Sequence, residues 1–324
     1  MRAVTVSDSG ELSIATIDDP VAGPDEVVID VVSAGVNRAD LLQRRGLYPP
    51  PPGAPDTLGL EVSGRIRAVG SDVVGWAPGD EVCALLAGGG YAEQVAVPAA
   101  QVLPVPAGVS VADAAALPEV ACTVVSNVIE AAHLVPGELL LIHGGSSGIG
   151  THAIQLARAL DARVAVTART ADKLDRCREL GADITINYAE QDFVQIISEH
   201  GGADVILDIV GAKYLARNVS ALRTGGRLVI IGMQGGTKAE LSIATLMAKR
   251  ASVIGTTLRS RPVDGNDGKG HVVARTRELT WPLIEAGKVV PVIDSVFGLD
   301  DADAAHQRLE RGESIGKVLL RVSD

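Results

Sequence analysis

Aromatic residues are scarce in this chain: phenylalanine, tryptophan and tyrosine together make up 2% of its 324 residues. Its core must therefore be aliphatic, and few side chains are available for stacking on nucleic-acid bases. Positive charge is not in excess either, because the formal net charge is −11 at pH 7. Such an acidic chain is repelled by nucleic acid and by anionic membrane surfaces. We expect small-molecule partners, with no nucleic acid and no membrane among them.

Long apolar runs and paired cysteines are also missing. Although 47% of the residues are hydrophobic, no run approaches the roughly 18–20 apolar residues of a membrane-spanning helix. The first residues do not resemble a secretory signal, and Cys83, Cys122 and Cys177 form no C-x-x-C pair. The sequence therefore predicts a protein of the reducing cytoplasm, with thiols that are buried or half-buried.

Two sequence patterns divide the chain. Residues 1–119 contain short β-like runs separated by glycine, proline and aspartate, whereas residues 120–258 alternate between strand and helix patterns. The second pattern is typical of a doubly wound parallel (Rossmann) sheet. Residues 259–324 are expected to fold back on the first domain. The predicted fold class is thus α/β, with the parallel sheet in residues 120–258 and a β-barrel-type domain in residues 1–119 and 259–324.

A glycine-rich turn joins the first predicted strand of the sheet to its first helix. The apolar residues 139–142 run into the sequence HGGSSGIG, and a helical pattern follows. Glycines let a polyanion approach the backbone, and the free N–H groups and dipole at a helix N-terminus stabilise its charge. We therefore predict that the turn binds the pyrophosphate of a dinucleotide through Gly145, Ser146, Ser147, Gly148, Ile149 and Gly150.

The end of the second predicted strand indicates which dinucleotide is bound. In NAD-selective folds an Asp or Glu about 20 residues after the glycines binds the ribose hydroxyl. Here the strand 163–167 runs into Ala168-Arg169-Thr170, and Lys173 follows. Cations pair with a 2′-phosphate that a carboxylate would repel, so the sequence predicts NADPH. The residues expected around this phosphate are Arg169, Thr170, Lys173 and Tyr188, with simple solvation as the alternative for the two cations.

The same glycines allow three other interpretations. Gly144 to Gly148 satisfies the G-x-S-x-G pattern of a serine hydrolase, but Ile149-Gly150 extends the phosphate pattern instead. The turn also resembles the fingerprint of short-chain dehydrogenases, yet none of the four tyrosines has a lysine four positions later. A turn that only packs a helix on a strand is the third alternative.

Over essentially its whole length the chain resembles the medium-chain dehydrogenase/reductase superfamily. Shared segments include the glycine turn, Leu180-Gly181-Ala182-Asp183 and Ile315-Gly316-Lys317-Val318. Residues 34–40, 49–53 and 126–128 are similar to the quinone oxidoreductases related to zeta-crystallin. The resemblance implies a GroES-like first domain, a substrate cleft between the domains, and a homodimer that pairs edge strands near residues 252–257.

The resemblance also bears on metal binding. In the alcohol-dehydrogenase branch a catalytic zinc is held at positions that match Asn37, Leu60 and Glu119 of this chain. Leucine cannot bind zinc and an amide is a poor ligand, so no tetrahedral site is expected. The six histidines also lack ligand spacing. Without a Lewis acid, alcohol oxidation is disfavoured, and we expect hydride transfer to a quinone or to an alkene conjugated to a carbonyl.

The resemblance further implies roles for single residues. Asn37 is expected beside the nicotinamide, where its amide donates to substrate or cofactor, unless it only closes a turn. Tyr48 is expected to donate to a quinone oxygen, unless it only packs. Thr123 is expected to contact the cofactor, with a local helix bond as the alternative. The remaining cofactor contacts are expected from Gly232, Met233, Gly255, Thr256, Leu258 and Lys317.

The predicted function is therefore a zinc-independent, NADPH-dependent quinone oxidoreductase, an assignment whose substrate rests on the resemblance. One alternative is an NADPH-dependent reductase of activated C=C bonds, acting on alkenals or enoyl thioesters. Another is a non-catalytic protein that binds NADPH.

Overall fold

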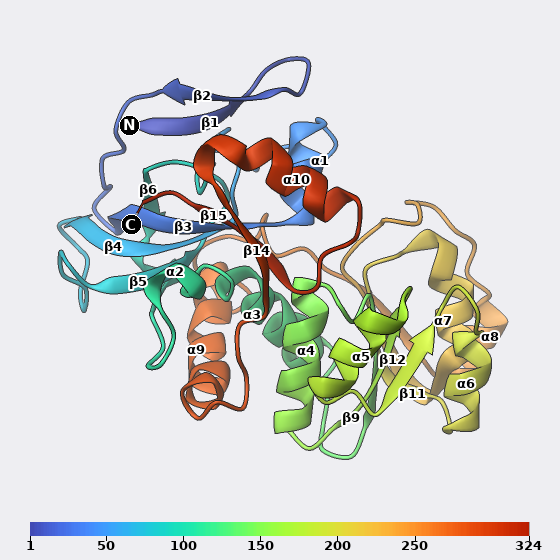
Figure 1. Cartoon of the computed structure of the whole chain (residues 1–324). Coiled ribbons are helices and arrows are strands. Elements are labelled where there is room, and N and C mark those ends of the chain that lie inside the picture. Colours follow the sequence, from blue (N-terminus) through green and yellow to red (C-terminus); the bar gives the residue numbers. More distant parts are fainter. Residues whose placement is uncertain (324) are drawn as a thin grey trace. The chain divides into compact units, whose positions relative to one another are not determined.

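The computed structural model describes residues 1–323, which form two compact units (Figure 1). Unit 1 comprises Met1–Cys122, Leu258–Ala286 and the described residues from Pro291 onward, and unit 2 comprises Thr123–Thr257 and Gly287–Val290. One unit is built on a parallel sheet and the other on a separate, largely antiparallel sheet. The predicted fold class is thus confirmed. Within residues 1–323 no helix is both long enough and apolar enough to cross a membrane.

Unit 1 is organised around the long strand β3, which pairs with β15, β4 and β6. Its buried face is aliphatic, with Val27, Ile29 and Val62 fully buried. The strand β15 pairs antiparallel with β3 (Figure 1), and in this pairing Val318 lies opposite Val36. The strands of this unit are β1 (Arg2–Val6), β2 (Leu12–Thr16), β3 (Glu26–Val36), β4 (Glu61–Val69), β5 (Glu81–Leu85), β6 (Gln94–Pro98), β7 (Val102–Pro104), β14 (Ile293–Gly298) and β15 (Lys317–Arg321).

Helices of unit 1 follow the strand ends. The helix α1 begins directly after β3, and α10 packs on β15 and β14. The bounds are α1 (Arg38–Arg44), α2 (Val111–Ala114), α9 (Lys269–Glu285) and α10 (Ala302–Glu310), with α3 (Pro118–Val124) at the junction with unit 2.

Unit 2 contains a parallel sheet in the order β10-β9-β8-β11-β12-β13. The chain enters at the central strand β8, proceeds outward through β9 and β10, and then crosses to β11 on the other side. Ligands of such sheets bind at the carboxyl ends of the strands where the order reverses, which here is the end of β8. The strands are β8 (Leu139–His143), β9 (Arg163–Ala168), β10 (Ile184–Asn187), β11 (Ala203–Asp208), β12 (Leu222–Ile230) and β13 (Ser252–Gly255).

The core of unit 2 is aliphatic around one small aromatic group. The rings of Phe193, Tyr214 and His143 lie within 5.1 Å of one another, measured between centroids. His143 is buried, and its two ring nitrogens bond to Thr167 and Asn218, so its role is structural. The helices are α4 (Gly148–Ala159), α5 (Ala171–Glu179), α6 (Phe193–Glu199), α7 (Leu215–Ala221) and α8 (Ile243–Lys249), and a π-helix spans Val125–Ala131.

Candidate active site

The turn between β8 and α4 leaves no room for side chains at its glycines. A Cβ atom on Gly145 would lie 2.7 Å from the Cβ of Val166, and one on Gly150 would lie 2.5 Å from the carbonyl oxygen of Gly145. Gly144 has a φ of 75°, which side chains disfavour. The N–H groups of Gly144 and Gly145 both donate to the carbonyl of Thr167, which ties the turn to β9. The backbone is therefore bare and fixed, as close approach of a pyrophosphate requires.

The N-terminus of α4 supplies the charge complement of this turn. Ser147 is the N-cap, and its hydroxyl accepts from the N–H of Gly150 at 3.0 Å. The N–H groups of Gly148 and Ile149 precede the first intrahelical bonds and have no partner within a helix. With the helix dipole they form an anion site, so the residues present fit a dinucleotide pyrophosphate.

The serine-hydrolase interpretation lacks a base in this structure. Its nucleophile would be Ser146, which is buried and forms no hydrogen bond to a histidine in residues 1–323. The nearest histidine in sequence, His143, is engaged with Thr167 and Asn218. A serine nucleophile is activated by an adjacent base, so the turn is better suited to binding phosphate.

His152, in the second turn of α4, is buried, and one of its two ring nitrogens has no hydrogen-bond partner within residues 1–323. This nitrogen is Nε2, and burial lowers the pKa of His152 from 6.5 to about 4. The folded chain therefore excludes a proton that the unfolded chain binds. The stabilising contribution of neutral His152 is complete above pH 6.5 and is lost as the pH falls through 4.

We expect His152→Leu to remove this acid sensitivity. Between pH 6.5 and pH 4 the free energy of unfolding of the variant should fall by about 3 kcal/mol less than that of the unchanged chain. Urea denaturation at stepped pH measures the difference. The matched control is His200→Leu, because His200 is exposed. An identical fall in the His152→Leu variant and the unchanged chain would contradict the assignment.

The residues predicted to bind the 2′-phosphate follow β9. Arg169 is exposed directly after this strand, and Thr170 is the N-cap of α5. Tyr188, half exposed, bonds through its N–H to the carbonyl of Ala168 at 3.1 Å. Because β9 and β10 are parallel neighbours, these residues lie at the same end of the sheet, where both strands have their carboxyl ends.

An acidic residue near this end of the sheet was not considered from the sequence. The hydroxyl of Thr170 donates to the carboxylate of Asp172, and this hydrogen bond is the main cause of a lowered Asp172 pKa. Thr170 is therefore already engaged, and Asp172 is ionised at neutral pH. Lys173 follows it in the first turn of α5.

The predicted nicotinamide rim lies at the ends of β12 and β13. A Cβ on Gly232 would lie 2.6 Å from the carbonyl oxygen of Ile209, so its backbone must be bare. Met233 is exposed, and Gly255 ends β13. Thr256 donates its hydroxyl to the side-chain oxygen of Asn127. The other predicted member, Leu258, is a buried residue of unit 1.

Asn127 is a candidate that the sequence reasoning did not single out. It lies in the π-helix after Thr123, is buried, and donates to the carbonyl of Thr123 at 2.8 Å while accepting from Thr256. π-Helical segments are rare and are frequent at functional sites. The signal for it in the sequence was its position in the segment 126–128, which had served only to support the family resemblance.

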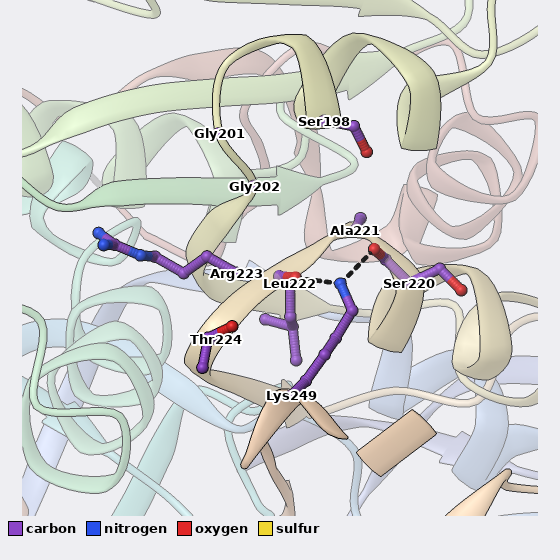
Figure 2. Close-up of a pocket in the computed structure, with 9 residues that line it drawn as sticks. All are labelled: Ser198, Gly201, Gly202, Ser220, Ala221, Leu222, Arg223, Thr224 and Lys249. Atoms are coloured by element: carbon purple, nitrogen blue, oxygen red, sulfur yellow. Dashed lines mark hydrogen bonds between the residues drawn. The ribbon is translucent and has the colours of Figure 1, made fainter. Parts of the chain in front are cut away.

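A hollow elsewhere in unit 2 does not belong to this site. It has a volume of about 410 Å³ and lies beside the start of β11 and β12. The glycine turn is at the other end of the strands, where β8 ends. Figure 2 shows Lys249 reaching the backbone there, where it donates to the carbonyls of Ser220, at 2.6 Å, and Leu222. A cation that binds the last carbonyls of a helix stabilises that helix end, so Lys249 has a structural role at α7.

Unit 1 contains a buried ionic cluster at the ends of three strands. Asn37 follows β3, Glu61 begins β4 and Lys317 begins β15. The ammonium of Lys317 contacts Glu61 Oε1 at 2.6 Å, Asn37 Oδ1 at 2.7 Å and the carbonyl of Val36 at 3.1 Å. Gly35 provides the space, because a Cβ there would lie 2.6 Å from Cδ of Glu61. Glu61 is 0% exposed and Lys317 5%.

This cluster fixes the orientation of the Asn37 amide. Its oxygen accepts from Lys317, and one N–H donates to Glu61 at 2.9 Å. The nitrogen lies 3.4 Å from the carbonyl of Gly35, too long for a strong bond. Asn37 is therefore held by long-range contacts, and its second amide N–H makes only the long bond to Gly35. The three N–H groups of the Lys317 ammonium are used inside the cluster. The predicted contact of Lys317 with the cofactor stays a prediction. Sequence reasoning missed Glu61.

The backbone of Asn37 is held by a second buried network. Asp40 accepts from the N–H of Asn37 at 2.7 Å, from the N–H of Gly59 at 3.0 Å and from the phenol of Tyr91 at 3.1 Å. The phenol of Tyr91 also contacts His306 Nε2 at 3.1 Å. Burial raises the pKa of Asp40 to about 6, against the opposing effect of these hydrogen bonds.

The residues at the zinc-ligand positions do not fit a zinc ion. Leu60 is buried and has no donor atom, and the Asn37 amide is engaged with Glu61 and Lys317. The backbone N–H of Glu119 donates to Glu61 Oε2 at 2.9 Å. In the part of the chain that the structure describes, no group of three or more His, Cys, Asp or Glu side chains is placed to hold a metal.

Tyr48 lies between α1 and the proline run and is half-buried. Burial raises its pKa, and the charge of Glu119 raises it further. Its phenol is therefore protonated at neutral pH and is able to donate a hydrogen bond.

Known proteins are similar to this chain in sequence and in fold. Residues 23–107 match the family "Alcohol dehydrogenase GroES-like domain", and residues 148–269 match "Zinc-binding dehydrogenase". Human quinone oxidoreductase is 30% identical over 329 residues, which cover 99% of this chain and 97% of that protein. The chain belongs to the medium-chain dehydrogenase/reductase superfamily. The predicted family is thus confirmed. One of the two matching families is described as zinc-binding, but the residues of this medium-chain oxidoreductase at the zinc-ligand positions do not fit zinc.

Two other similar proteins are a vesicle-protein homolog and a bacterial quinone oxidoreductase. The rat synaptic vesicle membrane protein VAT-1 homolog is 32% identical to this medium-chain oxidoreductase over 314 residues, covering 93% of the chain and 78% of the relative. The Thermus thermophilus quinone oxidoreductase, whose structure was also solved as a complex with NADPH, is 32% identical, with a TM-score of 0.85 and coverage of 99% and 100%.

Proposed function

We propose that the protein is a zinc-independent, NADPH-dependent quinone oxidoreductase. The observation that carries the proposal is the cluster of Asn37, Glu61 and Lys317, which holds a hydrogen-bond donor where a zinc-dependent relative would hold its metal. A quinone needs orientation and a hydrogen bond to the oxygen that gains charge, but no Lewis acid. The similarity to human and Thermus quinone oxidoreductases supports the same substrate class.

The residues of the chain have separable tasks in this proposal. The turn of Gly145 to Gly150 binds the pyrophosphate, and Arg169 with Lys173 binds the 2′-phosphate. When bound, NADPH supplies the hydride. The second amide N–H of Asn37, whose bond to Gly35 is long, orients the acceptor oxygen. The phenol of Tyr48 donates to the same oxygen as its charge grows.

The assignment of NADPH over NADH rests on charge. Arg169 has no ion-pair partner among the described residues, so its guanidinium is available to a phosphate. The Thermus relative was solved with NADPH, which supports the choice.

The function is tested by measuring the rate of NADPH oxidation from the loss of its absorbance, in parallel with the rate for NADH. The acceptors are a simple quinone, an ortho-quinone, an alkenal and a primary aldehyde. Fast, NADPH-selective turnover confined to quinones is expected. Turnover of the alkenal instead would establish the reductase of activated alkenes, because the same donors serve an enolate oxygen. Tight binding of NADPH without any turnover would establish a non-catalytic binding protein.

We also propose a homodimer through the β13 edge of unit 2. The strand β13 is the last in its sheet and is incompletely buried, and the helix α8 has no buried residue. Its side chains Ile243 and Met247, one helical turn apart, are 68% and 70% exposed. An uncovered edge strand beside exposed apolar side chains is typical of an interface.

Met247→Asp is expected to convert the dimer to a monomer, because a buried unpaired charge opposes association. Sedimentation velocity measures the change. Gln195→Asp, on the exposed face of α6 in the same unit, should leave the mass unchanged. A Met247→Asp dimer would refute this interface.

A reducing cytoplasm also stays a prediction, which the three buried free cysteines support.

A further inference from the structure

Arg259 is a buried cation bonded only to neutral groups. It is 4% exposed. Its guanidinium donates to the carbonyl of Ala87 at 2.7 Å, to Gln43 Oε1 at 2.7 Å and to the carbonyl of Tyr48 at 3.4 Å. No carboxylate forms an ion pair with it within residues 1–323. Burying a charge without a counter-charge is costly, so this arrangement requires an explanation.

A second buried cation lies beside it. Lys269 is 6% exposed, and its ammonium donates to the carbonyls of Arg259, at 3.2 Å, and Arg261, at 2.6 Å. Burial lowers the pKa of Lys269, and the charge of Arg259 lowers it further. Lys269 also begins α9, where the helix dipole disfavours a cation. Two buried cations thus lie beside each other in this part of unit 1, and the carboxylates that act on Arg259, those of Asp40 and Glu119, form no ion pair with it within residues 1–323.

The guanidinium of Arg259 lies over the ring of Tyr48. The centre of the guanidinium lies 5.3 Å from the centroid of the Tyr48 ring. Burial and Glu119 raise the pKa of Tyr48, whereas Arg259 lowers it. Of the charged groups that act on Tyr48, Glu119 on α3 opposes the phenolate and Arg259 favours it. Burial lowers the pKa of Arg259, and the charges of Tyr48, Asp40 on α1 and Glu119 raise it.

We propose that Arg259 is a positioning residue that stabilises negative charge on Tyr48 while Tyr48 donates its proton to the oxygen of the reduced acceptor. This inference rests on the proposed function. The hydride brings two electrons and one hydrogen to the quinone and leaves NADP⁺. The O–H bond of Tyr48 breaks, an O–H bond forms on the acceptor, and solvent returns a proton to the phenolate. The acceptors that benefit are those whose oxygen becomes anionic on hydride addition.

The first experiment needs no turnover. Tyrosine ionisation is followed by difference absorbance, and subtraction of the Tyr48→Phe titration isolates Tyr48 from the other three tyrosines. Arg259→Gln should raise the apparent pKa of Tyr48 by about 1 unit or more, and Arg259→Lys should leave it near its original value. Arg308→Gln is the control, since Arg308 pairs with Asp294 elsewhere in unit 1. An unmoved Tyr48 titration in Arg259→Gln would overturn the proposal.

The second experiment uses turnover. Arg259→Gln should lower kcat with the quinone about 10- to 100-fold with little change in KM. In a Tyr48→Phe background the same change should have almost no further effect, because the two residues act on one step. A full additional loss in that background would overturn the coupling. Should Arg259→Gln fail to fold, Arg259→Met replaces the cation with an apolar chain of similar length, which buried sites tolerate.

The two proposals fail in different ways. Absence of quinone turnover in the unchanged chain would refute the proposed function, while the titration would still report whether Arg259 acts on Tyr48. Turnover with an unmoved titration would refute only the role of Arg259.

Discussion

Lys317→Met will lower the free energy of unfolding by about 3–5 kcal/mol, the loss that follows removal of one partner from a buried ion pair. The variant leaves the carboxylate of Glu61, which is 0% exposed, without the cation that contacts it at 2.6 Å. The Asn37 amide loses its partner as well. Guanidinium denaturation followed by circular dichroism measures the loss.

Two controls separate charge from packing. Adding Glu61→Gln to Lys317→Met should restore most of the lost stability, because no buried charge then remains. Arg65→Met breaks a half-exposed pair with Glu81 in the same sheet and should cost at most about 1 kcal/mol. A loss in Lys317→Met no larger than that of Arg65→Met would contradict the prediction.

Arg169→Asp will lower the preference for NADPH over NADH by about 100-fold or more in kcat/KM. Arg169 is exposed after β9 at the predicted phosphate site. A hydrogen bond from a charged group contributes about 1.5–3 kcal/mol, and the new carboxylate repels the phosphate in addition. Steady-state kinetics with both cofactors and one quinone measures the ratio, and adding Lys173→Ala should extend the shift.

The matched control is Arg163→Asp, at the opposite end of the same strand. It introduces the same change of charge and is expected to leave the cofactor ratio unaltered. Equal shifts from the two variants would indicate a general charge effect, and no shift from Arg169→Asp would refute the phosphate assignment.

The parts of the fold that the sequence predicted are those encoded by consecutive residues. The glycine turn, the strand before it and the helix after it lie within 139–159, so local periodicity and backbone freedom suffice to recognise them. The steric reasons for Gly145 and Gly150 became visible only with Val166 and the turn carbonyls in place.

The parts that the sequence did not predict depend on distant residues. Asn37 and Lys317 are 280 positions apart, and no local pattern connects them. Glu61 belongs to no sequence motif that indicates a function. Arg259 lies in a polar segment whose composition is typical of a solvent-exposed loop. Its burial cannot be predicted locally, because the carbonyls that it contacts belong to the distant residues Ala87 and Tyr48. The helical pattern near residue 125 likewise gives no indication of π-helical pitch.

The pairing of β15 with β3 has a consequence for synthesis of the chain. A ribosome that adds about 5–20 residues per second needs on the order of tens of seconds to proceed from Asn37 to Lys317. Until Lys317 is added, Glu61 has no ammonium partner. The edge of β3 that later pairs with β15 meanwhile has to be covered by water or by a chaperone. All residues of unit 2 precede Lys317 in the chain, so unit 2 is by then fully translated. The glycine turn of unit 2 is thus complete before the amide of Asn37 is held in place by Lys317. Under the proposed function, a nascent chain therefore acquires its cofactor site before its acceptor site.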